Sequence, residues 1–142
     1  MLVSEILKDK GGEVFTVAPD LGLAEACAEL DRRRIGALVV CDGDRVVGVI
    51  SERDVTRAVG RDGADGLVRP VSHYMSKDVV FAAPSETVAV LMERMTDRRI
   101  RHLPVLREQR LAGVVSIGDL VKHQIAEARL EADSLRTYIA AG

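Results

Sequence analysis

The chain contains two copies of one sequence pattern, separated by a constant 65 residues. In the first copy the hydrophobic run 35–40 precedes the segment 46–54, and in the second the run 100–105 precedes the segment 111–119. No insertion or deletion interrupts this register. The offset pairs Gly48 with Gly113, Ser51 with Ser116, and Asp54 with Asp119. Two packed copies of one unit would therefore place two equivalent sites on one surface.

The length favours a shared core for the two copies. Each copy takes up about half of the 142 residues, and a unit so small buries too little surface to be stable alone. We therefore expect an intramolecular pseudo-dimer, with a first repeat over 1–66, a second over 67–121 and an additional helix over 122–142. Of the residues, 47% are hydrophobic but only 3% are aromatic, so this core should be aliphatic.

Composition argues against several classes of protein. The net charge of −2 does not suit a nucleic-acid partner, because binding to the phosphate backbone normally needs a basic excess. No apolar run approaches the roughly 18 residues of a membrane span, and no signal peptide is evident. Cys27 and Cys41 lack the spacing of a metal site or a disulfide framework. A cytoplasmic protein without a bound metal is expected.

Hydrophobic periodicity and turn residues predict a mixed α/β (α+β) fold in which each copy has the order β-α-β-β-α. The expected elements of the first copy are a short amphipathic segment at 3–7, a strand at 14–17, a helix from Pro19 to 34, a hairpin over 37–50, a helix over 51–59 and a linker over 60–66. Those of the second are a short helix at 71–75, a strand at 79–82, a helix over 86–98, a hairpin over 102–115 and a long helix over 116–140.

The spacing Ser-x-x-Asp occurs at the start of a predicted helix in both copies. The simplest interpretation is an N-terminal cap, in which Ser51 or Ser116 accepts from free backbone N–H groups and the aspartate suits the helix dipole. The same geometry also suits a nucleotide, because an exposed helix N-terminus binds phosphate and an aspartate can accept from ribose hydroxyls. Residue pattern alone does not choose between these two roles.

The segments Ile100-Arg101-His102-Leu103-Pro104-Val105 and Gly113-Val114-Val115-Ser116-x-x-Asp119, with the weaker copy over 35–55, resemble a tandem pair of cystathionine β-synthase (CBS) domains, also called a Bateman module. The resemblance covers about 3–121 and implies two clefts between the repeats. It further implies a regulatory module for an adenosyl ligand, with AMP first and ADP, ATP, NADH or S-adenosylmethionine behind it, and no catalytic cofactor.

The resemblance also implies roles for individual residues. Asp54 and Asp119 would hold ribose, with Ser51 and Ser116 near phosphate, and Arg53, Arg101 and His102 would meet phosphate. The adenine would lie against the first strand and the residue before each serine. The full set of implied nucleotide contacts is Thr16, Val17, Ile50, Ser51, Arg53, Asp54, Phe81, Ala82, Arg101, His102, Pro104, Val115, Ser116 and Asp119.

Two other functions remain open. The chain could be an adaptor with vestigial clefts that binds a protein through its last helix, whose apolar stripe also suggests a homodimer. It could also be an enzyme acting on a nucleotide, but no nucleophile stands near a base at a readable spacing and there is no P-loop. Gly36 and Ala37, which replace the Arg101-His102 pair in the first copy, make equal occupancy of the two clefts doubtful.

Overall fold

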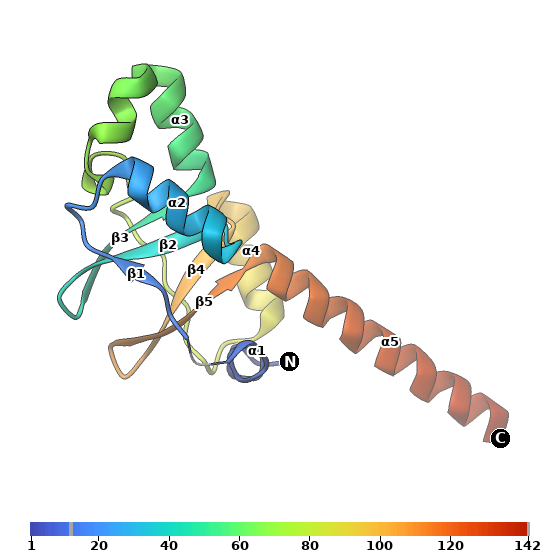
Figure 1. Cartoon of the computed structure of the whole chain (residues 1–142). Coiled ribbons are helices and arrows are strands. Elements are labelled where there is room, and N and C mark those ends of the chain that lie inside the picture. Colours follow the sequence, from blue (N-terminus) through green and yellow to red (C-terminus); the bar gives the residue numbers. More distant parts are fainter. Residues whose placement is uncertain (12, 142) are drawn as a thin grey trace.

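The computed structural model describes residues 1–11 and 13–141. It is a mixed α/β fold with two small sheets, as predicted (Figure 1). The α-helices are α1 (Val3–Lys10), α2 (Leu23–Arg33), α3 (Glu52–Asp62), α4 (Val88–Arg98) and α5 (Ile117–Ala141), with 3₁₀ helices η1 (Gly63–Val68) and η2 (Val71–His73). The strands are β1 (Thr16–Val17), β2 (Ala37–Asp42), β3 (Arg45–Ser51), β4 (His102–Arg107) and β5 (Arg110–Ser116).

The two sheets repeat one topology. Strand β1 runs parallel to β2, which pairs with β3 as an antiparallel hairpin, and β4 and β5 form the matching hairpin 65 residues later. The pair Val17–Val40 in the first sheet corresponds to a single parallel bridge, Ala82–Val105, beside the second. The pseudo-dimer expected from the repeat is therefore present.

One predicted strand is wrong and one predicted linker is helical. The segment 79–82 contributes only Ala82 to β4, because the chain just before it bonds to the other sheet, where Ser76 and Val49 exchange backbone hydrogen bonds of 3.0 and 3.1 Å. The segment 60–66 continues α3 to Asp62 and then forms η1. There the hydroxyl of Tyr74 donates a hydrogen bond of 2.6 Å to Oδ2 of Asp62.

Each hydrophobic core is completed by a segment from the other half of the chain. Helix α1 precedes the strands and helices of the first β-α-β-β-α unit, but Val3, Ile6 and Leu7 are buried in the core of the second repeat. In turn, the segment 67–75, which precedes the second such unit, contributes buried Val71 to the core of the first repeat. The two exchanged segments are related by 68 rather than 65 residues, because the connection after α1 is three residues longer than its counterpart.

The repeated glycines make room for these exchanged segments. A Cβ atom on Gly48 would lie 2.5 Å from Sδ of Met75 and 2.9 Å from the carbonyl oxygen of Ser76. A Cβ atom on Gly113 would lie 2.6 Å from Cδ2 of Leu7. Glycine in a strand interior often marks such a close approach. The repeated glycine thus serves packing between the two halves of the chain.

Helix α5 begins in the second core and then leaves the body of the molecule (Figure 1). Leu120 is fully buried, whereas large apolar side chains farther along, such as Leu135 and Ile139, are 61% and 69% exposed. In the described part of the chain, no helix combines the length and apolar character needed to cross a bilayer.

We expect Gly48→Ala to lower the free energy of unfolding by about 1–3 kcal/mol, the usual cost of overpacking, and Gly113→Ala to cost less. The difference arises because a methyl at position 48 meets a backbone carbonyl, while a methyl at 113 meets the movable end of Leu7. Urea denaturation measures both. Gly60→Ala is the control, since nothing lies within 4 Å of its Cβ position in α3, and it should stabilise by about 0.5–1 kcal/mol. If Gly113→Ala lowered the free energy of unfolding as much as Gly48→Ala or more, this account would be contradicted.

Candidate functional site

The first turn of α3 has one backbone donor left for a ligand. The N–H of Ser51 donates to Oδ2 of Asp54 at 2.9 Å, and the N–H of Asp54 donates to Oγ of Ser51 at 3.3 Å, which is a complete capping box. The N–H of Glu52 is bonded to the carbonyl of Gly36 at 3.0 Å. Of the four N–H groups that begin a helix, that of Arg53 is then the one without a partner among the described residues. The cap expected from the sequence forms, and it leaves this donor and Oδ1 of Asp54 available.

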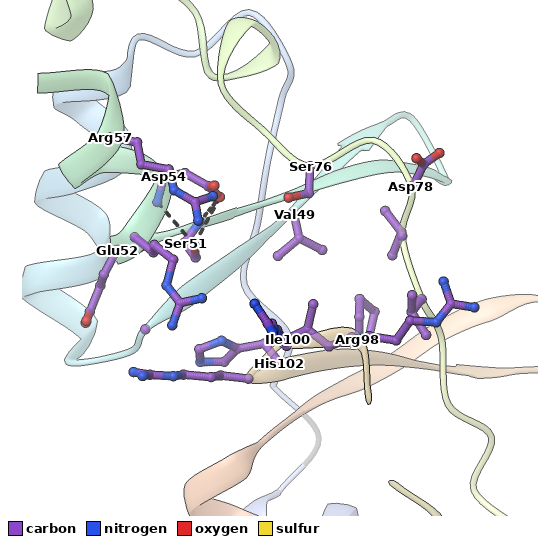
Figure 2. Close-up of a pocket in the computed structure, with 17 residues that line it drawn as sticks. Val49, Ser51, Glu52, Asp54, Arg57, Ser76, Asp78, Arg98, Ile100 and His102 are labelled. Carbon is purple, nitrogen blue, oxygen red and sulfur yellow. Dashed lines mark hydrogen bonds between the residues drawn. The ribbon is translucent and has the colours of Figure 1, made fainter. Parts of the chain in front are cut away.

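This helix start opens into a cleft of about 540 Å³ between the two repeats (Figure 2). Such a volume is in the usual range for small-molecule sites. Strand β3 and α3 form one wall, while the segment after Met75 and the end of α4 with the start of β4 form the others. The lining residues are Gly36, Val49, Ser51, Glu52, Arg53, Asp54, Arg57, Ser76, Asp78, Val79, Val80, Arg98, Arg99, Ile100, Arg101, His102 and Pro104.

Cationic side chains dominate the cleft. Three carboxylates line it, those of Glu52, Asp54 and Asp78, against five guanidinium groups. None of these five groups forms an ion pair within 4.0 Å in the part of the chain that the structure describes. Among the carboxylates, that of Asp54 belongs to the capping box and its residue is 92% buried. The five cations are Arg53, Arg57, Arg98, Arg99 and Arg101. Unpaired arginines in a concave site create a positive potential that favours an anionic ligand.

His102 lies at the floor of this cleft, against Gly36 (Figure 2). A Cβ atom on Gly36 would be 2.9 Å from Nε2 of His102, so a larger residue at position 36, such as the arginine found in the second copy, would require the ring to shift. Burial lowers the pKa of His102 below its ordinary value; Lys10 and Arg101 add to this effect, and Glu52 and Asp119 oppose it. The ring is therefore neutral at pH 7.

The second cleft that the resemblance implies would lie around Ser116 and Asp119, where the side chain of Lys10 binds instead. The capping bonds are repeated here, with 2.9 and 3.1 Å between Ser116 and Asp119. The Lys10 ammonium donates to Oδ2 of Asp119 at 2.7 Å and to the carbonyl of Val114 at 2.8 Å. In the first cleft the equivalent carbonyl, that of Val49, accepts from a backbone N–H instead. The side chain of Lys10 is thus one of the differences between the two helix starts.

Lys10 also helps to lower the pKa of Asp119. Burial by itself would raise the pKa of this carboxyl, but the hydrogen bonds from Lys10 and from the backbone of Ser116 together outweigh burial and hold the pKa below its ordinary value. Asp119 is consequently ionised at neutral pH and already has a cation beside it.

The structure brings six of the residues expected to contact ligand into the open cleft: Ser51, Arg53, Asp54, Arg101, His102 and Pro104. The other eight lie elsewhere. Thr16 and Val17 pair with β2, while Ile50 and Val115 are fully buried and Ala82 is 3% exposed. The carbonyl of Phe81 accepts from Arg94, and Ser116 and Asp119 belong to the cleft that Lys10 occupies.

Several lining residues were missed by sequence reasoning. Arg57 could have been found, because it lies one helical turn after Arg53 and so shares its face. Arg98 and Arg99 directly precede the Ile100-Arg101-His102 segment, which was a usable signal. The segment 76–80 had no such signal in the sequence, because its place in the cleft depends on the exchange of segments between the cores.

We expect Lys10→Met to lower the free energy of unfolding by up to about 1 kcal/mol at pH 7, as for a partly exposed ion pair. The lowered pKa of Asp119 adds stability above the ordinary aspartate pKa of about 3.9, and this contribution is lost as the pH falls through the lowered pKa. The difference between the proteins should therefore shrink near pH 3. Urea titrations at both pH values, with exposed Lys8→Met as the control, check this. An equal loss at the two pH values would argue against the ion pair.

Comparison with known proteins supports the architecture. The model of the CBS domain matches residues 3–61 and again residues 71–126. The mitochondrial CBS domain-containing protein CBSX3 of Arabidopsis thaliana is 32% identical and aligns with 99% of this chain and 72% of its own. The crystal structure of ATU1752 from Agrobacterium tumefaciens has a TM-score of 0.85 and 44% identity, covering 87% of this chain and 99% of that one. PAE2072 from Pyrobaculum aerophilum, solved in complex with AMP, has a TM-score of 0.75 and 28% identity over 84% of this chain and 89% of that one. With the family model matched twice in the register of the internal repeat, this chain belongs to the CBS domain family as a tandem pair.

Proposed function

We propose that this chain is a regulatory module that binds AMP or a related adenine nucleotide in the open cleft at the start of α3. The observation that carries the proposal is the capped helix start, with its free Arg53 N–H and buried Asp54, facing a cleft lined by five arginines. The AMP complex of the similar protein from Pyrobaculum aerophilum supports an adenine nucleotide as the ligand.

The lining divides into parts that suit the parts of a nucleotide. Oδ1 of Asp54 is available to accept from ribose hydroxyls, since the capping bonds use Oδ2. The N–H of Arg53 and the guanidinium groups would hold phosphate. Val49, Val80 and Ile100 supply apolar surface for a base.

The charge of the cleft ranks the candidate ligands. AMP, ADP, ATP and NADH all carry phosphate and are favoured by the excess of arginine over carboxylate. S-adenosylmethionine carries a sulfonium cation and no phosphate, so the same potential disfavours it. We therefore place the phosphate-bearing ligands ahead of S-adenosylmethionine. We also propose a stoichiometry of one ligand per chain, because Lys10 occupies the second cleft.

Regulation would follow from binding across the interface between the repeats. A ligand in the open cleft would contact α3 of the first repeat and β4 of the second. It can shift the equilibrium between two arrangements of the repeats only if it binds one arrangement better than the other. We propose a non-catalytic, cytoplasmic module that self-associates and passes this change to a regulated protein. The free thiols of Cys27 and Cys41 suit a reducing compartment.

The adaptor function has one observation in its favour, which is the exposed outer part of α5. It requires that the clefts be vestigial, so it predicts no response to any nucleotide. It also predicts a bound protein that is lost on truncation after Val121.

A thermal-shift panel with AMP, ADP, ATP, NADH and S-adenosylmethionine tests the proposal on protein unfolded and refolded to remove any bound ligand. At about 100 times its dissociation constant, a ligand should add about 2.7 kcal/mol of stability, which raises the melting temperature by several degrees. We expect the phosphate-bearing ligands to give this shift.

Asp54→Ala and Asp119→Ala form a matched pair for this panel. Both remove a capping carboxylate from an equivalent helix start, so each should lower the free energy of unfolding without ligand by about 1 kcal/mol. Asp119→Ala should cost somewhat more, because it also removes the ion pair with Lys10. Only Asp54 lines the open cleft, and only Asp54→Ala should abolish the shift. If no ligand shifts the wild-type protein, the adaptor function is favoured. If Asp119→Ala alone abolishes the shift, the ligand binds in the other cleft.

The low pKa of His102 predicts a pH-dependent affinity. An incoming phosphate would raise this pKa, so binding takes up a proton and affinity increases as the pH falls toward about 6; each pKa unit gained corresponds to about tenfold. Calorimetry at pH 6 and 8, in buffers of different ionisation enthalpy, measures both affinity and proton uptake. His102→Gln should remove the proton uptake that the ligand's own phosphate does not explain. Unchanged uptake in this variant would place the titrating group elsewhere.

A further inference from the structure

The outer part of α5 has a heptad pattern. Apolar residues follow the alternating spacing of four and three residues that keeps one seam along a supercoiled helix pair. The isoleucines lie at a positions and the valine and leucine at d positions, with alanine in the middle layers. The seam consists of Val121, Ile125, Ala128, Ala132, Leu135 and Ile139.

This seam is not the face that α5 packs against its own chain. The inward face is a different stripe: Leu120 is fully buried, His123 lies 3.0 Å from the sulfur of Met1, and Glu127 pairs with the N-terminal amine at 3.5 Å. On the seam, by contrast, the large side chains are 40% exposed at Val121 and increasingly exposed toward the tip, reaching 69% at Ile139.

The residues that flank the seam select an orientation for a second copy. All three e positions are basic: Lys122, Arg129 and Arg136. In an antiparallel pair these cations would face one another. In a parallel pair each e residue faces a g residue of the other helix, so Glu131 at g faces the partner's Arg136, and the reverse contact forms by symmetry. Among residues 1–11 and 13–141, the one ion pair of Arg136 is a loose contact with Asp133, 3.8 Å away at an exposed site.

We propose that the occupant of this seam is the α5 helix of a second copy, and that two chains associate through a parallel coiled coil over residues 121–139. This deepens the self-association in the proposed function and is independent of nucleotide binding. The pair of modules would lie at one end of the coil, related by a two-fold axis along it.

Two leucines on α5 provide a matched test. Leu135 lies in the seam and Leu130 outside it at an f position, yet they are 61% and 66% exposed. Light scattering coupled to size exclusion, over a range of protein concentrations, should show a dimer for the wild type and for Leu130→Glu, and a monomer for Leu135→Glu. The nucleotide thermal shift, measured on the same samples, reports separately on the fold and on the proposed function. A monomeric wild type, a dimeric Leu135→Glu or a monomeric Leu130→Glu would overturn the proposal.

A single cysteine near the tip tests the orientation. With Cys27 and Cys41 replaced by serine, Ile139→Cys should form a disulfide-linked dimer on mild oxidation, because the same position lies beside itself in a parallel pair. In an antiparallel pair the two cysteines would lie at opposite ends of the coil. Absence of the cross-link in a protein that is dimeric by light scattering would overturn the parallel arrangement.

Discussion

The exchange of leading segments between the two cores is the constraint on which the rest of the structure depends. Helix α1 completes the core of the second repeat and the segment around Val71 completes that of the first. Neither repeat can therefore separate from the other without exposing apolar side chains. The same exchange carries Ser76–Val80 past β3 and so builds one wall of the open cleft. Packing and the candidate site thus have a common origin.

The internal repeat predicted the fold because most core positions on the strands and on α2 and α4 recur 65 residues later. Leu23, Ala26 and Leu30 on α2 correspond in this way to Val88, Leu91 and Met95 on α4, and all are buried. The Ser-x-x-Asp caps could equally be predicted from the sequence, since they depend only on local hydrogen bonds. The exchange of segments could not be predicted, because α1 and the segment 67–75 follow a different offset and the residues that they contact lie far away in the sequence. The wrong strand at 79–82 and the missed lining residues of the segment 76–80 both follow from it.

The asymmetry of the two clefts comes from few residues. Both helix starts have the same caps, yet one faces a set of unpaired arginines and the other is neutralised by Lys10. His102 lies between them, with Glu52 on one side and Lys10 and Asp119 on the other influencing its pKa. Charged side chains near both helix starts therefore act on the same imidazole.

The position of α1 also has a consequence for how the chain is made. This helix is synthesised before the other elements of both cores, yet the residues that bury it extend to Leu120. Most of the polypeptide must be synthesised before Val3, Ile6 and Leu7 have a core to enter, whereas the first repeat needs only the residues up to about 75. During synthesis the core of the first repeat therefore has all of its residues well before α1 has the strands and helices that bury it.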